Sequence, residues 1–221
     1  MQAMILAAGR GKRMMPLTKN TPKPLLKVGG KTLIERAIIN IKAAGISDII
    51  INTAYLGEQI KQHLGNGNRL GVRIQYSIEK TSLETAGGII KALPLLGNEP
   101  FIVVNSDVLF DLDLSTIRLP ENSLAHLILV DNPTYKTNGD FSLNGKQIIP
   151  AKKPNYTFSG IGIYHPYFFK LAPQNEQKIA LISLFQIAIK QHKLTGEYCQ
   201  FEWQDIGTPE RLELANKLVT N

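Results

Sequence analysis

Cysteine and long apolar runs are nearly absent from this chain. Its 221 residues include one cysteine, Cys199, so an internal disulfide and a cysteine-ligated metal centre are both excluded. No stretch approaches the roughly 18 apolar residues of a membrane-spanning helix. The N-terminus has no basic region ahead of its short apolar stretch, which argues against a signal peptide. We therefore expect a cytoplasmic protein that does not bind membranes.

The sequence patterns of covalent catalysis are missing as well. There is no G-x-S-x-G turn, and Cys199 has no obvious base to activate it. The four histidines are dispersed without the spacing of metal ligands, so we expect surface or core roles for His63, His126, His165 and His192. A nucleophilic enzyme is therefore not indicated.

The net charge of +7 raises the question of a nucleic-acid partner. The basic residues are scattered, apart from a cluster near the N-terminus and Lys152-Lys153, and they do not alternate with aromatic residues. A site for a polyphosphate explains the N-terminal cluster equally well. We expect small phosphorylated substrates and no nucleic acid.

The length and the pattern of apolar residues predict one α/β domain over residues 1–221. Strand-like and helix-like segments alternate in the first half, and Thr32 with Glu35 forms a capping box at the start of one helix. Repeated right-handed β-α-β units give a Rossmann-like, mainly parallel sheet with helices on both faces. Strands are expected at 2–8, 48–52, 72–76, 101–105, 124–130 and 158–164, a hairpin at 140–150, and helices at 32–44, 56–64, 85–93 (ended by Pro94), 179–191 and 210–219.

The most informative segment is the loop that follows the first strand. Gly9 and Gly11 allow backbone N–H groups to approach an anion. Four cations surround the same turn: Arg10, Lys12, Arg13 and Lys23. The spacing does not match the P-loop pattern, and position 14 is methionine where the dinucleotide fingerprint needs glycine. The loop is therefore predicted to hold phosphates by a different arrangement.

Three further segments are expected at the carboxyl ends of strands, where ligands of such sheets bind. The paired glycines in residues 83–88 open a helix and allow a flat ring to lie against the backbone. Asp107 follows the most apolar strand, and a carboxylate there is a candidate Mg²⁺ ligand. Residues 203–209, W-Q-D-I-G-T-P, combine Asp205 with a turn and a helix start. On spacing alone, each segment could instead have a purely structural role. Residues 83–88 would then be a tightly packed helix start, Asp107 the cap of a loop, and residues 203–209 the cap of a helix.

The pattern L-A-A-G-x-G-x-R-M-x-P-L-T, with P-K-P ten residues beyond Arg13, resembles the signature of the sugar-1-phosphate nucleotidyltransferases. The segments L-E-T-A-G-G, N-S-D and W-x-D-I-G-T-P are similar to further motifs of this family, with Glu84 and Ser106 in place of two family glycines. The resemblance implies catalytic roles for Arg13, Lys23 and Asp107. It implies Mg²⁺ on Asp107 and Asp205, sugar contacts from Asn105 and Asp140, and a nucleotide site made of Ala7, Gly9, Gly11, Lys12, Arg13, Lys23, Leu83, Thr85 and Gly87.

The resemblance also implies the reaction. A nucleoside triphosphate, expected to be UTP, would react with a sugar 1-phosphate to give a sugar nucleotide and pyrophosphate. Residues 1–110 would form the nucleotide-binding half and residues 111–221 the sugar-binding half of a monomer or weak dimer. The segments D-N-P at 131–133 and G-D-F at 139–141 resemble a subgroup of cell-wall sugar recycling whose sugar bears a 3-O-lactyl group. Other hexose 1-phosphates with UTP, dTTP or GTP remain alternatives, and a non-catalytic sugar-nucleotide sensor is a more distant one.

Overall fold

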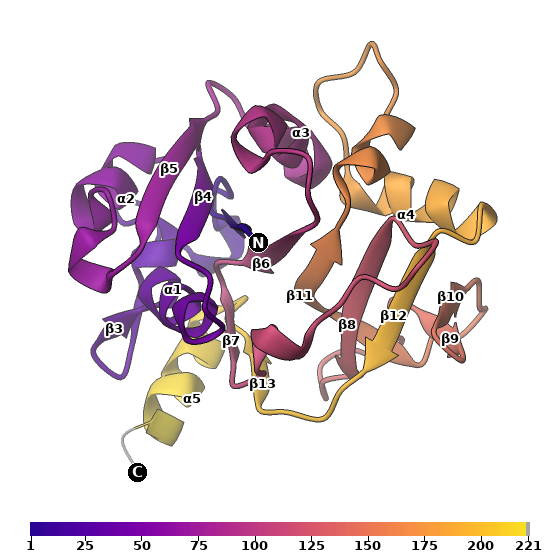
Figure 1. The fold of residues 1–221 in the computed structure, drawn as a ribbon. Coiled ribbons are helices and arrows are strands. Elements are labelled where there is room, and N and C mark those ends of the chain that lie inside the picture. Colours follow the sequence, from indigo (N-terminus) through magenta and orange to yellow (C-terminus); the bar gives the residue numbers. More distant parts are fainter. Residues whose placement is uncertain (220–221) are drawn as a thin grey trace.

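A computed structural model describes residues 1–219 of the chain. Its centre is one mixed sheet of nine strands, to which both halves of the chain contribute (Figure 1). Within this sheet the strands run in the same direction, except for β11 and β10, which are antiparallel to their neighbours. The mainly parallel α/β fold is thus confirmed. The spatial order is β5 (Arg73–Ile78), β4 (Asp48–Thr53), β1 (Ala3–Leu6), β6 (Phe101–Asn105), β11 (Tyr156–Tyr164), β8 (Ala125–Asp131), β12 (Leu194–Tyr198), β10 (Gln147–Ile149) and β9 (Ser142–Asn144).

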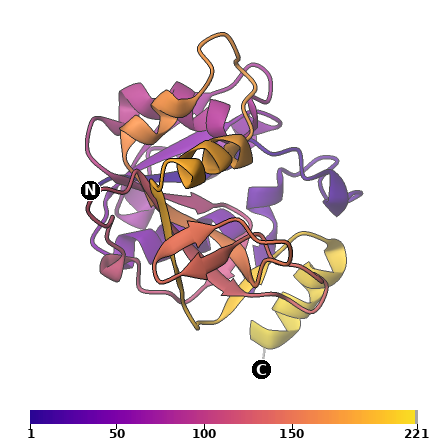
Figure 2. The same ribbon diagram turned by 90° about the vertical axis from the view of Figure 1, so that its right-hand side faces the viewer.

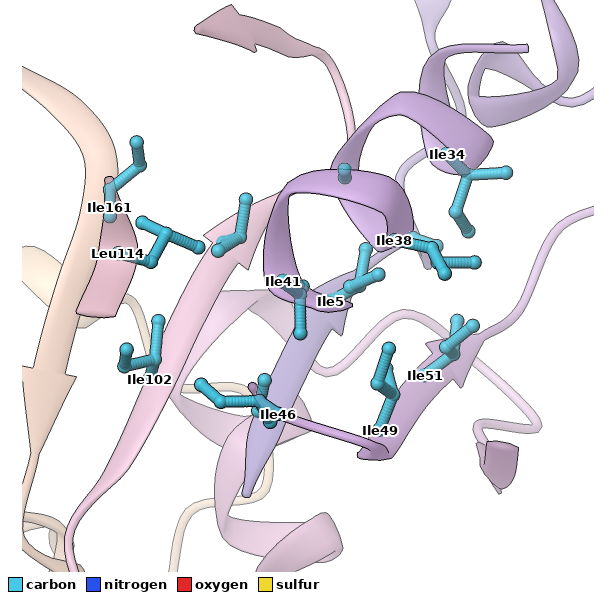
Figure 3. Packing of buried hydrophobic residues seen from close by; sticks show 14 of the residues in the cluster. Ile5, Ile34, Ile38, Ile41, Ile46, Ile49, Ile51, Ile102, Leu114 and Ile161 are labelled. Carbon is cyan, nitrogen blue, oxygen red and sulfur yellow. The ribbon is translucent and has the colours of Figure 1, made fainter. Parts of the chain in front are cut away.

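Helices cover both faces of the sheet because successive strand residues point to opposite sides. On one face, Ile34, Ile38 and Ile41 of α1 pack against Ile5 and Ile51 of β1 and β4 (Figure 3). On the other face, α3 and α4 lie beside each other over the sheet (Figure 2). The helices are α1 (Leu33–Ala43), α2 (Gly57–Leu64), α3 (Glu84–Leu96), α4 (Leu181–Lys190) and α5 (Pro209–Val219), with short 3₁₀ helices at Lys12–Met14, Lys23–Leu25, Asn68–Leu70, Leu114–Thr116 and Pro166–Leu171.

Two small ribbons complete the fold. β7 (Val108–Phe110) pairs antiparallel with β13 (Trp203–Asp205), and β2 (Lys27–Val28) pairs with β3 (Lys31–Thr32). The first ribbon joins the end of the chain to the segment that follows β6. Neither ribbon is predicted from the sequence, because strands of two or three residues carry no readable periodicity.

The sequence places most elements within a few residues of their observed bounds. The capping box at the start of α1 is confirmed, since Thr32 and Glu35 exchange their hydrogen bonds. The predicted end of the third helix at Pro94 is wrong, because α3 continues to Leu96. Pro94 removes only one backbone hydrogen bond, because it lies near the helix end. Burial of Leu96 in the core offsets this loss, so the helix continues past the proline. No helix within residues 1–219 combines the length and apolarity needed to cross a membrane.

Candidate active site

The glycine-rich loop after β1 lines a cavity of about 380 Å³ at the carboxyl ends of β1 and β6. We call it the loop cavity. Gly11 has a φ of 60°, and a Cβ atom there would lie 3.1 Å from side-chain carbons of both Lys23 and Thr18. Thr18 also donates a hydrogen bond to the Gly11 carbonyl over 2.8 Å. Glycine is therefore needed at position 11. The cavity is lined by Leu6, Ala8, Gly9, Gly11, Lys12, Arg13, Met14, Lys23, Pro24, Asn52, Ser82, Glu84, Thr85, Asn105, Ser106, Asp107 and Gly207.

Three of the four cations of this loop line the cavity, and Arg10 does not. Lys12 and Arg13 line it with exposed side chains, while Arg10 lies over the ring of Tyr55 at 5.6 Å. The side chain of Lys23 is only 10% exposed and forms an ion pair with Oδ2 of Asp107. The structure therefore brings Lys12, Arg13, Lys23 and Asp107 together, as the sequence predicts.

Asp107 and Asp205 are adjacent because β7 and β13 pair. Asp205 lies opposite Val108 in the register, and the Ile206 amide donates to the Asp107 carbonyl over 2.8 Å. The two residues also line one further cavity of about 470 Å³, which we call the carboxylate cavity and which also includes Asp140. Asp205 follows Asp107 by 98 positions in the chain, so the pairing of β7 with β13 is what brings the two aspartates together.

The two carboxylates suit a hard divalent cation. Mg²⁺ takes one or two protein carboxylates and completes its shell with water and phosphate oxygens. Among residues 1–219 no group of three or more histidine, cysteine or acidic side chains is placed to hold a metal ion. A pair of oxygen donors beside a cation-rich cavity fits a metal that also binds substrate phosphates.

Asp205, a predicted metal ligand, is held by residues that the sequence does not single out. Oδ1 of Asp205 accepts hydrogen bonds from the Tyr135 hydroxyl and from the Arg211 guanidinium. Partial burial and the bond to Asp205 raise the pKa of Tyr135, which keeps its hydroxyl a donor. Arg211 follows Asp205 by only six residues, so its contact with Asp205 could have been predicted from the sequence. Tyr135 comes from a distant loop, and no sequence pattern indicates its contact.

A buried polar chain connects the ends of β1, β4 and β5. Oδ1 of Asn52 accepts the Ala7 amide over 2.9 Å, and Nδ2 of Asn52 donates to Oε1 of Glu79 over 2.7 Å. The second oxygen of Glu79 accepts the Leu83 amide over 3.0 Å. Ala7 is thus buried behind the loop cavity and does not line it. The sequence does not single out Asn52 or Glu79 as site residues, although Asn52 is the next-to-last residue of β4 and Glu79 directly follows β5.

The predicted base-binding segment divides between two cavities. Thr85 lines the loop cavity, whereas Leu83 and Gly87 line a separate cavity of about 380 Å³ together with Gln177 and Ile179. The Gly87 amide donates to the Ile179 carbonyl over 3.1 Å. The backbone N–H of Gly87 is therefore already used within the chain, and its predicted contact with a nucleotide stays a prediction.

Asn105 connects the loop cavity to the second half of the chain. It borders the loop cavity, the carboxylate cavity and a third cavity of about 520 Å³. A Cβ atom at Gly160, whose φ is 81°, would lie 2.6 Å from Nδ2 of Asn105. Asp140 borders the carboxylate cavity and the third cavity, and its Oδ2 accepts Lys136 at 2.6 Å and the Phe158 amide at 2.9 Å. The two predicted sugar-binding residues thus share one continuous cleft.

Three phenylalanines line the cavity of about 520 Å³, and we call it the aromatic cavity. Its walls come from β11, from α4 and from the segment before β9. Besides Asn105 and Asp140, it is lined by Glu84, Thr85, Phe141, Phe158, Ala180, Leu181, Ile182 and Phe185. Lys152 and Lys153 are exposed and do not line any of the four cavities described here.

Comparison with known proteins identifies the class to which this fold and this cleft belong. The nucleotidyl transferase family model matches residues 2–221, and the chain belongs to that family. It is 46% identical to N-acetylmuramate alpha-1-phosphate uridylyltransferase of Neisseria meningitidis serogroup B, over 99% of this chain and 98% of the relative. It is 30% identical to D-glycero-alpha-D-manno-heptose 1-phosphate guanylyltransferase of Campylobacter jejuni, over 95% of this chain and 96% of that relative.

A solved structure shows the same architecture. A Bacillus anthracis protein described as a glucose-1-phosphate thymidylyltransferase, crystallised with sucrose, superposes with a TM-score of 0.87 at 26% identity. The match covers 100% of this chain and 95% of that one. The chain is therefore a member of a family of sugar-1-phosphate nucleotidyltransferases, enzymes that generally use a divalent metal ion.

Proposed function

We propose that this protein transfers UMP from UTP to N-acetylmuramic acid α-1-phosphate, with release of pyrophosphate. The observation that carries the proposal is the 46% identity, over almost the full length, to the Neisseria enzyme of that name. The 30% identity to a guanylyltransferase for a heptose 1-phosphate supports the same reaction class with a different base and sugar. Transfer to another hexose 1-phosphate is accordingly the second candidate.

The loop cavity suits the triphosphate. Gly9 leaves open space beside the backbone for phosphate oxygens, and Lys12 and Arg13 offer positive charge at the edge of the cavity. Arg13 would hold the β- and γ-phosphates, and Lys23, deeper in the cavity, would stand near the α-phosphate. Thr85 lines the same cavity, so it is available to the nucleoside.

The reaction requires no covalent intermediate. A phosphate oxygen of the sugar 1-phosphate attacks the α-phosphorus, a new P–O bond forms, and the bond to the pyrophosphate oxygen breaks. The residues of the cleft serve to align the two phosphates and to offset negative charge as the pyrophosphate leaves. Lys23 is suited to this second task because it is buried beside Asp107 and its charge is little screened by water.

We propose that Mg²⁺ is the divalent ion and that Asp107 and Asp205 hold it. When bound, Mg²⁺ would neutralise phosphate charge and orient the reacting oxygens. A non-catalytic sensor of sugar nucleotides would not need this pair of carboxylates, which argues against the sensor alternative. We further propose that the enzyme acts in the cytoplasm as a monomer or weak dimer.

The cleft also offers a physical reason for an acylated amino sugar. Asn105 and Asp140 present hydrogen-bonding groups beside the apolar walls of the aromatic cavity. A plain hexose carries hydroxyl groups only, whereas N-acetylmuramic acid adds two methyl groups, on its acetamido and lactyl substituents. An apolar wall next to polar groups is suited to such substituents.

Release of pyrophosphate by the purified protein tests the proposal. UTP, dTTP and GTP are each incubated with N-acetylmuramic acid, N-acetylglucosamine, glucose and mannose 1-phosphates. We expect UTP with N-acetylmuramic acid 1-phosphate to give the highest kcat/KM, at least about 10-fold above N-acetylglucosamine 1-phosphate, or about 1.4 kcal/mol. Equal or reversed values for these two sugars would favour the general hexose 1-phosphate enzyme.

A further inference from the structure

Two side chains from different parts of the chain bind the same oxygen of Asp205. The Tyr135 hydroxyl and the Nη1 atom of Arg211 both donate to Oδ1. Tyr135 lies in the loop between β8 and β9, and Arg211 lies in the first turns of α5. The guanidinium carbon of Arg211 also stacks 3.4 Å from the centroid of the Tyr135 ring. The three residues therefore form a closed cluster in which each contacts the other two.

This cluster fixes the rotation of the Asp205 carboxylate. Two donors on one oxygen hold the group in a single orientation and leave the lone pairs of the other oxygen, Oδ2, available. Oδ2 lies next to Gly207, where a Cβ atom would come within 2.9 Å of it. The same position is 2.9 Å from Nη1 of Arg211 and 3.5 Å from Nη1 of Arg13. Gly207 also lines the loop cavity, so Oδ2 lies at the edge of that cavity. Asp107 is held in a similar manner, by Lys23 on its own Oδ2.

We propose that Tyr135 and Arg211 are positioning residues for the divalent cation, holding Asp205 by Oδ1 so that Oδ2 binds the metal. The inference rests on the proposed role of Asp205 as a metal ligand. Hydrogen bonds to a ligating carboxylate typically change metal affinity by about 10- to 100-fold, because they orient the ligand before the metal arrives.

Removal of the tyrosine hydroxyl is a mild change that should leave the fold intact. Tyr135 is 51% exposed, so its ring contributes little to the core, and Tyr135→Phe retains the surface on which Arg211 stacks. Tyr198→Phe is a matched control. Tyr198 donates to Oδ2 of Asp131 over 2.8 Å, also a tyrosine–aspartate hydrogen bond on the protein surface, but away from Asp107 and Asp205.

Metal binding is measured first without substrate, from the free Mn²⁺ signal in electron paramagnetic resonance. We expect the dissociation constant of Mn²⁺ to rise about 10-fold in Tyr135→Phe and to stay within about 2-fold of wild type in Tyr198→Phe. Arg211→Lys keeps the charge but loses the planar stacking, and we expect it to weaken Mn²⁺ binding as well. Equal dissociation constants for wild type and Tyr135→Phe would overturn the proposal.

The Mg²⁺ dependence of pyrophosphate release gives a second readout. In Tyr135→Phe the Mg²⁺ concentration for half-maximal rate should rise about 10-fold, while the rate at saturating Mg²⁺ falls by less than about 3-fold. In an Asp205→Ala background the same Tyr135→Phe change should have no further effect on Mn²⁺ affinity, because the two residues act as one unit. An additive effect there would show that Tyr135 does not act through Asp205.

The two proposals can fail separately. If wild-type protein releases no pyrophosphate with any donor and sugar, the proposed function fails. The Mn²⁺ affinities of the wild type and its variants would still decide whether Tyr135 and Arg211 position a metal ligand.

Discussion

Lys23 and Asp107 form an ion pair that connects the glycine-rich loop to the carboxyl end of β6. Nζ of Lys23 contacts Oδ2 of Asp107, and the two side chains are 10% and 28% exposed. A lysine at this position neutralises one of the two carboxylates proposed to hold the metal, and it is close to where phosphate would bind. Loss of Lys23 or of Asp107 should therefore affect activity far more than stability, and mainly through kcat.

Loss of either carboxylate should abolish most of the activity. We expect Asp107→Ala and Asp205→Ala each to lower kcat by at least about 100-fold, the scale of one lost electrostatic contact in a catalytic site. Circular dichroism and thermal unfolding should remain close to wild type, because both side chains lie in the cleft. Asp113→Ala, which removes an exposed helix-capping carboxylate, serves as a control for general effects. Near-full activity of Asp205→Ala in Mg²⁺ would contradict the two-ligand arrangement.

Lys23 should act on the transition state more than on substrate binding. Negative charge moves toward the pyrophosphate as the bond breaks. The attraction between this charge and a buried cation nearby is therefore strongest in the transition state. Lys23→Ala is expected to depress kcat more than it raises the KM for UTP, as measured by steady-state kinetics. Lys19→Ala, an exposed lysine of the same segment, should change neither value. A change confined to KM would make Lys23 a binding cation only.

Gly160 should be needed for the geometry of Asn105. Its φ is 81°, and a Cβ atom would lie 2.6 Å from Nδ2 of Asn105. Gly160→Ala is therefore expected to raise the KM for the sugar 1-phosphate by about 10-fold, since Asn105 must move, and to destabilise the fold by about 1–2 kcal/mol through the left-handed backbone. Gly145→Ala isolates the backbone effect, because Gly145 has a φ of 57° with nothing within 4 Å of the added Cβ. Similar KM values for the two variants would remove the assigned role of Asn105.

These residues also show what the sequence could and could not predict. The loop from Gly9 to Lys23 is readable because glycines and cations at fixed spacing are local features, and so is the capping box at Thr32. The meeting of Asp205 with Tyr135 depends on the pairing of β7 with β13 and on the course of a loop, neither of which leaves a periodic signal. The chain from Ala7 through Asn52 to Glu79 likewise arises only when three strands align.

Glu35 should make stability depend on acid pH. Burial alone would raise the pKa of its carboxyl, but hydrogen bonds from the Thr32 backbone, Arg69 and the Thr32 hydroxyl, with the charge of His63, lower it from 4.5 to about 2. Because the folded pKa is depressed, the stabilisation is complete well above pH 4.5 and is lost as the pH falls toward 2. The difference corresponds to at most about 3 kcal/mol at neutral pH.

Urea unfolding of Glu35→Gln checks this linkage. The variant keeps hydrogen-bonding groups for the capping box but removes the charge. We expect it to be less stable than wild type at pH 7, with a deficit that shrinks steadily below pH 4.5. Glu58→Gln, an exposed glutamate of α2 with an ion pair to Lys61 at 3.1 Å, should show a deficit of less than about 1 kcal/mol throughout. A constant deficit for Glu35→Gln across this range would mean that the charge does not stabilise the fold.

Ile182 should contribute to the choice of sugar. It lines the aromatic cavity and is 50% exposed, so it offers an apolar surface to a substrate at little cost to the core when changed. If the methyl groups of an acylated sugar rest there, Ile182→Ser removes apolar contact worth about 1 kcal/mol, roughly one methylene in such a site. The ratio of kcat/KM for N-acetylmuramic acid 1-phosphate to that for glucose 1-phosphate should therefore fall about 5-fold. Ile39→Ser, at a 40% exposed position of α1 outside the cleft, should leave the ratio unchanged. An unaltered ratio in Ile182→Ser would assign the selectivity to the polar contacts of Asn105 and Asp140 instead.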